Sequence, residues 1–231
     1  TASENRLALQ ELLPEAIISC YDSYDDSQLS HLLDWADVVC IGCGLGMGQI
    51  SEKILKNVLK NVSCPCVIDA DGLNLLSRNI ELLNQCCAPV ILTPHMKEMS
   101  RLTGWSIDTI MEDRFQALDQ IIKQSGPDTK SSIICVLKDS RTVVAQTNRQ
   151  RFVNLAGNNS MAKGGSGDVL AGTIAGLLAQ HMAPFEATTV GVFLHACGGD
   201  EAKKSKGSYS VLARDLIQGM ADAMKNAKEC R

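Results

Sequence analysis

The sequence is poor in aromatic residues and has no excess of positive charge, and both shortages narrow the range of functions. Aromatic side chains make up 4% of the 231 residues, and the formal net charge is −4. Surfaces that bind nucleic acids combine clustered lysine and arginine with stacking aromatic side chains. We therefore expect no nucleic acid among the partners, whereas a small anion held by local geometry is compatible with this charge.

Long apolar stretches are also missing. No segment approaches the roughly 18 to 20 uninterrupted apolar residues of a membrane span, and residues 1–10 lack the basic start and apolar run of a secretory signal. The chain has ten cysteines, and Cys40, Cys66 and Cys135 lie in strand-like runs. In a chain this apolar they favour reduced core thiols over a disulfide scaffold. We expect a soluble, cytoplasmic protein that does not associate with membranes.

Short apolar runs alternate with helical patterns along the chain. Strands are expected at residues 38–41, 66–69, 89–92, 133–137, 142–145 and 151–153. Helices are expected at residues 49–61, 72–77, 95–103, 109–125, 168–180, 184–203 and 212–228. The first strands are separated by helices and should be parallel, whereas the last strands are joined by polar turns and should be antiparallel.

This order predicts one α/β domain over residues 1–231, because right-handed crossovers place helices on both faces of a parallel sheet. Residues 125–132 are expected to form a loop that is too short to separate two domains. Gly172 and Gly176 lie one turn apart inside an expected helix, where each glycine costs about 1 kcal/mol relative to alanine. Close backbone packing at both glycines is the expected compensation.

Residues 159–168, Asn-Ser-Met-Ala-Lys-Gly-Gly-Ser-Gly-Asp, place a glycine turn and a carboxylate at the start of an expected helix. Closely spaced glycines let backbone N–H groups converge on one point, and the helix start adds partial positive charge. Such a turn stabilises a phosphate. Asp168 would repel that phosphate unless its carboxylate takes a proton from the group that attacks phosphorus. The segment therefore predicts phosphoryl transfer.

A second glycine turn, residues 42–48, follows the first expected strand. Met47 stands where a dinucleotide fingerprint requires glycine or alanine, and the chain contains no Walker loop. The turn is therefore either a flexible connection or a ligand contact. Cys40 and Cys43 have the spacing of a redox dithiol, but they straddle a strand end and no second pair completes a zinc site. We interpret them as core thiols.

Polar residues follow the next strands as well. Asp69, Asp71 and Asn74 could orient a metal or a sugar hydroxyl, but capping of the next helix also accounts for them. His95 should face the same rim as Gly46 and Asp71, with a structural histidine as the alternative.

Two further segments have alternative interpretations. The turn 138–142 suits either a surface hairpin or a contact with a nucleotide phosphate. His195 lies in an apolar helical pattern, and we interpret it as packed or hydrogen-bonded instead of catalytic.

These motifs in this order resemble the ADP/ATP-dependent NAD(P)H-hydrate dehydratases, a branch of the ribokinase-like superfamily. The likeness covers most of the chain, and the combination of motifs is specific although each motif alone is not. The segments that carry it are 44–46, 69–74, 92–99, 136–142 and 161–172.

The resemblance implies a ribokinase-like α/β fold without a separate lid domain. It also implies repair of NADH or NADPH whose nicotinamide ring has taken up water at C6. ADP or ATP would phosphorylate the C6 hydroxyl, phosphate would leave, and the double bond would return. Asp168 would be the base, and the backbone amides of Gly165, Ser166 and Gly167 would hold the transferring group.

The resemblance also implies the binding residues. The hydrated dinucleotide would contact Gly46, His95 and Asp168. Mg²⁺ would neutralise phosphate charge, no protein metal ligand is assigned, and relatives suggest a homotetramer. The adenine nucleotide would contact Gly167 and the turn Lys138, Asp139, Ser140, Arg141 and Thr142.

The chain departs from the family pattern in several places. Cys43 stands where the family has proline, Asp139 where it has glycine, and Ser166 where it has threonine. Family domains also carry an earlier strand, glycine-rich turn and helix, and we expect the sequence to start after that segment. Two alternatives stay open: a small-metabolite kinase of the hydroxymethylpyrimidine or hydroxyethylthiazole type, and a non-catalytic nucleotide-binding protein.

Overall fold

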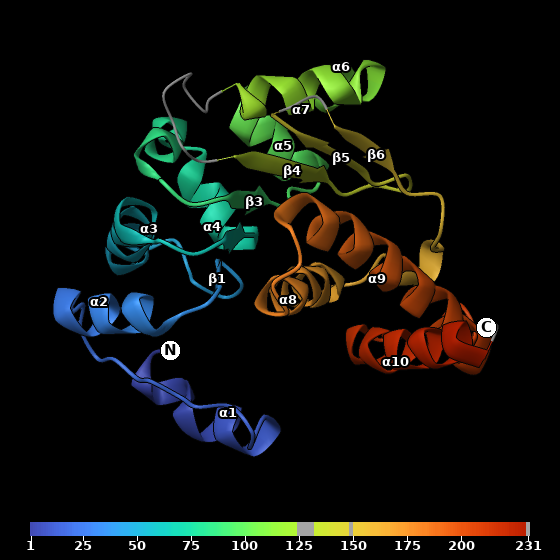
Figure 1. Ribbon diagram of the computed structural model, residues 1–231, viewed down its shortest axis with the longest axis horizontal. Helices are drawn as coiled ribbons and strands as arrows, with labels where there is room; N and C mark the ends of the chain where they lie inside the picture. Colours follow the sequence, from blue (N-terminus) through green and yellow to red (C-terminus); the bar gives the residue numbers. More distant parts are fainter. Residues whose placement is uncertain (124–131, 148–149, 230–231) are drawn as a thin grey trace.

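The computed structural model describes residues 1–123, 132–147 and 150–229, and its centre is one six-stranded sheet in the order β1-β2-β3-β4-β5-β6 (Figure 1). Strands β1 to β4 are parallel, and β4, β5 and β6 are antiparallel. This division follows the connections, because short turns join antiparallel strands whereas parallel strands need crossovers. The strands are β1 (Val39–Ile41), β2 (Cys66–Ile68), β3 (Val90–Leu92), β4 (Ile133–Leu137), β5 (Val143–Gln146) and β6 (Arg151–Val153).

The helices connect the strands and cover the sheet. None of those in the described part of the chain is long and apolar enough to cross a membrane. They are α1 (Arg6–Leu12), α2 (Asp26–Trp35), α3 (Gln49–Asn61), α4 (Ala70–Leu76), α5 (Met96–Thr103), α6 (Ile107–Glu112), α7 (Arg114–Ile122), α8 (Ser166–Ala179), α9 (Pro184–Lys206) and α10 (Ala213–Glu229). Short 3₁₀ helices occur at Ser3–Asn5, Ile80–Gln85 and Asn159–Met161.

Two apolar cores lie on opposite faces of the sheet. Ile68 and Leu92 belong to the core shared with α3, α4, α5 and α7. Val67 and Ile91 belong to the core shared with α8 and α9. Strands that are buried on both faces explain the continuous apolar runs in the sequence. Figure 1 shows α10 outside α9, away from the sheet. The expected α/β class, with a mainly parallel sheet between helices, is confirmed.

One expected helix is divided in two. The pattern at 109–125 corresponds to α6 and α7, because Asp113 is extended, with φ −143°, and its carboxylate accepts a hydrogen bond from the Gln116 N–H at 2.9 Å. This cap starts α7 at Arg114. Residues 124 and 125 of the expected helix lie outside the described residues, as does the expected loop at 125–132 except Ser132.

The expectation of close packing at Gly172 and Gly176 is wrong. A Cβ on either residue would meet no atom within 4 Å among the described residues, because both glycines lie on the exposed side of α8. Other glycines make the close contacts. A Cβ on Gly198 would lie 2.5 Å from Met220 Cγ, and one on Gly219 would lie 2.1 Å from the Gly198 carbonyl oxygen. Helices α9 and α10 therefore approach each other through glycine.

Candidate active site

The glycine turn at residues 42–48 rests directly on the end of β2. Gly42 has φ +121°, and a Cβ there would lie 1.9 Å from the Asp69 carbonyl oxygen. Only glycine allows this close approach of two backbones. Further along the turn, the Gly46 N–H donates to Asp71 Oδ2 at 2.8 Å. Gly46 and Asp71 therefore share one rim of the sheet, as the order of strand ends predicted.

Asp69 is the buried charge of this rim. It is 1% exposed, and its Oδ1 accepts hydrogen bonds from the Ala70 N–H at 2.8 Å and from Lys138 Nζ at 2.7 Å. A buried carboxylate requires such partners because desolvation penalises its charge. Both interpretations of Asp69 therefore hold in part. It caps α4, and it also belongs to a group of charged side chains at the carboxyl ends of β2 and β4.

The glycine turn before Asp168, residues 164–167 (the cradle), forms the start of α8. Gly165 is the N-cap, with φ +86°. The N–H groups of Gly165 and Gly167 make no hydrogen bond to the described residues, whereas the Ser166 N–H donates to the Lys163 carbonyl oxygen at 3.3 Å. A Cβ on Gly167 would lie 3.1 Å from Lys138 Nζ. A helix N-terminus and an ammonium group therefore converge, which suits an anion.

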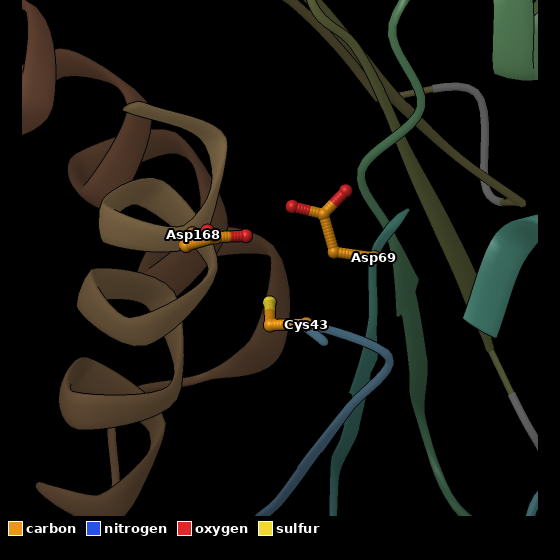
Figure 2. A group of neighbouring side chains, drawn as sticks. All are labelled: Cys43, Asp69 and Asp168. Carbon is orange, nitrogen blue, oxygen red and sulfur yellow. The ribbon is translucent and has the colours of Figure 1, made fainter. Parts of the chain in front are cut away.

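Asp168 is the third residue of α8 and lies in the open. One oxygen of its carboxylate, one oxygen of the Asp69 carboxylate and the Cys43 Sγ all lie within 4.8 Å of one another. Figure 2 shows the Asp168 side chain directed toward Asp69, with the Cys43 sulfur below the two. An exposed carboxylate in the first turn of a helix can also serve only to stabilise the helix, because its negative charge interacts favourably with the helix dipole. Its position beside Asp69 and the glycine cradle adds the geometry of a site.

The interpretation of Cys40 and Cys43 as core thiols is wrong, although Cys66 and Cys135 are buried as expected. β1 is an edge strand, so its side chains and the following turn are covered less than the inner strands. The pKa of the Cys43 thiol is raised, first by its hydrogen bond with Cys40 and then by partial burial and by the Asp168 carboxylate. The same contact lowers the pKa of Cys40.

A half-buried hydrogen-bond network, which the sequence did not predict, holds the segment that leads into the cradle. Asp200 of α9 accepts hydrogen bonds from the Gly157 N–H at 3.1 Å and from Asn158 Nδ2 at 2.7 Å. Asn158 Oδ1 accepts in turn from the Ser160 N–H at 3.0 Å. Asn158 before a turn is a recognisable capping signal, but nothing in the sequence joins it to Asp200.

His195 and Ser166 lie behind the cradle, and each is 8% exposed. Neither His195 Nε2 nor Ser166 Oγ has a hydrogen-bond partner among the described residues. Burial lowers the pKa of His195 to about 4. The prediction that His195 is packed inside the protein is confirmed.

His95 begins α5 and takes part in a capping box. Its Nδ1 accepts a hydrogen bond from the Glu98 N–H at 3.1 Å, and Glu98 Oε2 accepts from the His95 N–H at 2.8 Å. The imidazole is nevertheless 49% exposed. It stands at the end of β3 beside Lys138, whose N–H donates to the Pro94 carbonyl oxygen at 2.8 Å. The structural role is established, and the exposed ring edge is available to a ligand.

The residues of the turn 138–142 have two different surroundings: Lys138 lies at the cradle, and the others form the turn between β4 and β5. Lys138 reaches Asp69 and Gly167, as described above. Asp139 pairs with Arg114 of α7 at 2.8 Å, and Arg141 Nη1 donates to the Leu155 carbonyl oxygen at 3.1 Å. Thr142 Oγ1 donates to the Asp139 carbonyl oxygen at 3.2 Å. These contacts brace the turn, while Ser140 is exposed at its tip.

Comparison with known proteins relates this arrangement to one family. The family model described as NAD(P)H-hydrate dehydratase matches residues 1–221. The ADP-dependent (S)-NAD(P)H-hydrate dehydratase of Neisseria meningitidis is 35% identical over 222 residues, which cover 94% of this chain and 73% of that protein. The bifunctional NAD(P)H-hydrate repair enzyme of Moorella thermoacetica is 37% identical over 84% of this chain.

Solved structures share the fold. The ADP/ATP-dependent NAD(P)H-hydrate dehydratase of Bacillus subtilis, crystallised with ATP and Mg²⁺, superposes with a TM-score of 0.81. It is 26% identical, and the match covers 98% of this chain and 77% of that one. The ribokinase-like fold is thereby confirmed. The chain spans 34% to 42% of the length of the bifunctional repair enzymes that it resembles. The chain belongs to the NAD(P)H-hydrate dehydratase family.

Proposed function

We propose that the protein dehydrates hydrated NADH or NADPH, using ADP or ATP as the phosphoryl donor. The observation that carries the proposal is the convergence of the cradle, Lys138 and an accessible Asp168 at the carboxyl ends of the parallel strands. In open α/β sheets this edge is where ligands bind. The family match supports the choice of a dehydratase over a small-metabolite kinase or a binding protein.

The residues of the cradle would hold and orient the transferring group. The N–H groups of Gly165 and Gly167, which make no hydrogen bond to the described residues, would bind a phosphate without losing an internal hydrogen bond. The Ser166 N–H would exchange its 3.3 Å contact with Lys163 for a phosphate oxygen. Lys138 adds positive charge on the other side of Gly167. These dipoles and charges act strongest where water is excluded.

Asp168 would act on the acceptor. Its carboxylate would take the proton of the C6 hydroxyl as that oxygen attacks phosphorus. Asp69 cannot exchange roles with it freely, because Asp69 is buried and already accepts two hydrogen bonds through Oδ1. Gly46 and His95 would contact the hydrated dinucleotide from the ends of β1 and β3, and the turn 138–142 would contact the adenine nucleotide.

The acidic side chains also fit Mg²⁺. Carboxylate oxygens are preferred ligands of this ion. One Asp69 oxygen is directed toward Asp168, and Asp69 Oδ2 lies 3.5 Å from the place where a Cβ on Gly167 would stand. Asp69 and Asp168 would hold the ion together with the nucleotide phosphates. When bound, Mg²⁺ supplies charge neutralisation on the phosphates.

The location, domain organisation and assembly of the protein are proposed from its cysteines, its sheet and its family. We propose a cytoplasmic protein, since the cysteines of the described chain are all free thiols. We also propose that residues 1–231 act as one domain, because the described strands form one sheet. A homotetramer is proposed from family likeness, and light scattering in solution tests it. Nucleic acid is not a proposed partner, given the net charge of −4.

The test is recovery of nicotinamide absorbance from hydrated NADH or NADPH with Mg²⁺ and either ADP or ATP. Asp168→Asn should lower turnover by about 10²-fold to 10⁴-fold, the usual contribution of a positioned base, and leave nucleotide affinity nearly unchanged. Asp108→Asn on exposed α6 is the matched control and should behave as the parent protein. Near-normal turnover in Asp168→Asn would show that the base is assigned wrongly.

The same assay separates the alternatives. Tight nucleotide binding without any recovery of absorbance would favour the non-catalytic protein. Accumulation of a stable phosphorylated product from a hydroxymethylpyrimidine or hydroxyethylthiazole would favour the kinase.

A further inference from the structure

The thiol of Cys43 plays no part in the proposed phosphoryl transfer. It is exposed at the turn after β1 and faces the start of α8. Its sulfur lies within 4.8 Å of a carboxylate oxygen of Asp69 and of one of Asp168. Sulfur and oxygen donors thus face one another from three segments that are distant in the sequence.

The Asp69 carboxylate supplies a second, independent observation. Its side chain is 2% exposed, and Oδ1 accepts both of its hydrogen bonds. Oδ2 receives none from the described residues, and it lies 3.5 Å from the place where a Cβ on Gly167 would stand. Figure 2 shows one Asp69 oxygen directed toward Asp168. Lys138 balances the charge of this carboxylate through Oδ1, and the lone pairs of Oδ2 remain available to a cation.

We propose that Cys43, Asp69 and Asp168 form a binding site for one thiophilic divalent cation of the Zn²⁺ or Cd²⁺ type. A thiolate and two carboxylates are ligands that Zn²⁺ takes in proteins, with the fourth position left for water or another thiol. Cys40 borders Cys43 and offers such a thiol. Coordination breaks the Cys43 S–H bond, and the proton leaves to solvent.

The three ligand atoms need to move only slightly closer together to bind one ion. Tetrahedral Zn²⁺ with the usual bond lengths holds sulfur and oxygen ligands about 3.5 Å apart, while the three atoms here lie within 4.8 Å. Cys43 and Asp168 are exposed and can rotate toward the ion, whereas Asp69 is held by Lys138 and the α4 backbone. The buried ligand is therefore fixed and the two exposed ligands close on it.

The donor set distinguishes this site from binding of Mg²⁺. Mg²⁺ prefers an octahedral shell of oxygen ligands, whereas thiolate sulfur selects softer ions. The position also has a consequence that rests on the proposed function. A Zn²⁺ or Cd²⁺ ion at this site would displace Mg²⁺ from Asp69 and Asp168, so it would inhibit dehydration even with Mg²⁺ and nucleotide in excess.

Direct binding of Cd²⁺ to the reduced, nucleotide-free protein tests the site without relying on activity. Thiolate-to-cadmium absorption in the ultraviolet reports sulfur coordination, and equilibrium dialysis gives the stoichiometry. We expect one tight Cd²⁺ per chain, at least tenfold weaker binding in Cys43→Ser and in Asp168→Asn, and parent-like binding in Cys87→Ser, which removes another exposed thiol. Excess Mg²⁺ should not displace the ion.

Equal Cd²⁺ affinity in the parent and in Cys43→Ser, with both variants folded by circular dichroism, would overturn the proposal, as would displacement by Mg²⁺. The activity assay is separate. If Cd²⁺ binds through Cys43 but hydrated NADH is never repaired, the site stands and the proposed function fails. If repair proceeds but Cd²⁺ binds elsewhere, the function stands and this site fails.

Discussion

At the scale of single residues, the two carboxylates of the candidate site differ in their exposure to solvent. Asp69 is buried and paired with Lys138, whereas Asp168 is exposed next to it. One carboxylate is therefore held in place and the other can meet a ligand. Glu98 follows the same logic behind His95: burial raises the pKa of its carboxyl, while the His95 N–H opposes that shift.

His195 gives a prediction about pH and stability. Burial lowers its folded-state pKa to about 4, below the ordinary value of about 6.5. A depressed histidine pKa means that the unfolded chain binds the proton first, so stability is complete above pH 6.5 and falls toward pH 4. Between pH 7.5 and pH 5 this group should cost about 2 kcal/mol of unfolding free energy.

The measurement is urea unfolding at both pH values. His195→Gln should lose about 2 kcal/mol less than the parent between them. His31→Gln, at an exposed position of α2, is the control and should follow the parent. Identical pH dependence in His195→Gln and the parent would contradict a buried neutral imidazole.

At the scale of elements, helix α8 contributes both to the candidate site, through its first turn, and to the core, through its buried side. Its first turn presents the free N–H groups of the cradle, while Leu170, Ile174 and Leu178 bury one side against the sheet. The opposite side is open, which leaves Gly172 and Gly176 without packing partners among the described residues. Those two glycines carry the helix penalty without any compensation visible in the structure.

Alanine at these positions should therefore stabilise the protein. Gly172→Ala and Gly176→Ala should each raise the unfolding free energy by about 0.5 to 1 kcal/mol, because alanine has the higher helix propensity and no neighbour is displaced. Gly219→Ala is the opposing control: its Cβ would meet the Gly198 carbonyl oxygen at 2.1 Å, so α9 and α10 must separate. Thermal unfolding should place the first two variants above the parent and the third below it.

At the scale of the whole molecule, the Asp69–Lys138 pair ties together two strands that are not neighbours. β3 runs between β2 and β4, and the 2.7 Å contact spans its carboxyl end. Helix α8 covers the other face of the sheet, and its residue Gly167 lies against the same ammonium group. Both helix layers and the sheet meet at this pair.

Removing the Lys138 ammonium from the Asp69–Lys138 pair should lower the unfolding free energy of the protein. Lys138→Met leaves the buried Asp69 carboxylate unpaired and should cost about 3 kcal/mol of unfolding free energy. The double variant Lys138→Met with Asp69→Asn should recover much of that loss, because asparagine is uncharged and can still cap α4. Urea unfolding of the two variants measures the difference. Equal losses in both would mean that the cost is lost packing and not an uncompensated charge.

Recognition of the fold from the sequence succeeded where the signal is local. The apolar runs and turn signals predicted β4 and β6 at their observed bounds and the other strands within one residue. Strands β2, β3 and β4 are buried on both faces and must therefore be apolar throughout, whereas β6 is largely exposed. Helices α1 and α2 were not predicted, since α1 has no buried residue and α2 buries only Leu33. The division between α6 and α7 depends on the cap made by Asp113, which lies within a continuous helical pattern.

Recognition of the site was partial for the same reason. The glycine turn before Asp168, and the strand-end positions of Gly46 and His95, could be predicted because glycines, caps and strand ends have local signatures. Asp69 could be considered but not assigned, since its contact with Lys138 joins residues 69 positions apart. Cys43 was placed in the core, because a spacing of two cysteines says nothing about which strand lies at the sheet edge.

By itself, the amino-acid sequence determined the α/β alternation, the family, and a glycine turn followed by an acid at the start of a helix, all of which depend on the order of neighbouring residues. Only the tertiary structure decided which charges meet, which thiols are open, and which glycines are crowded. Those properties depend on distances between segments remote in the chain, and such distances exist only after the sheet has formed and both helix layers have packed on it.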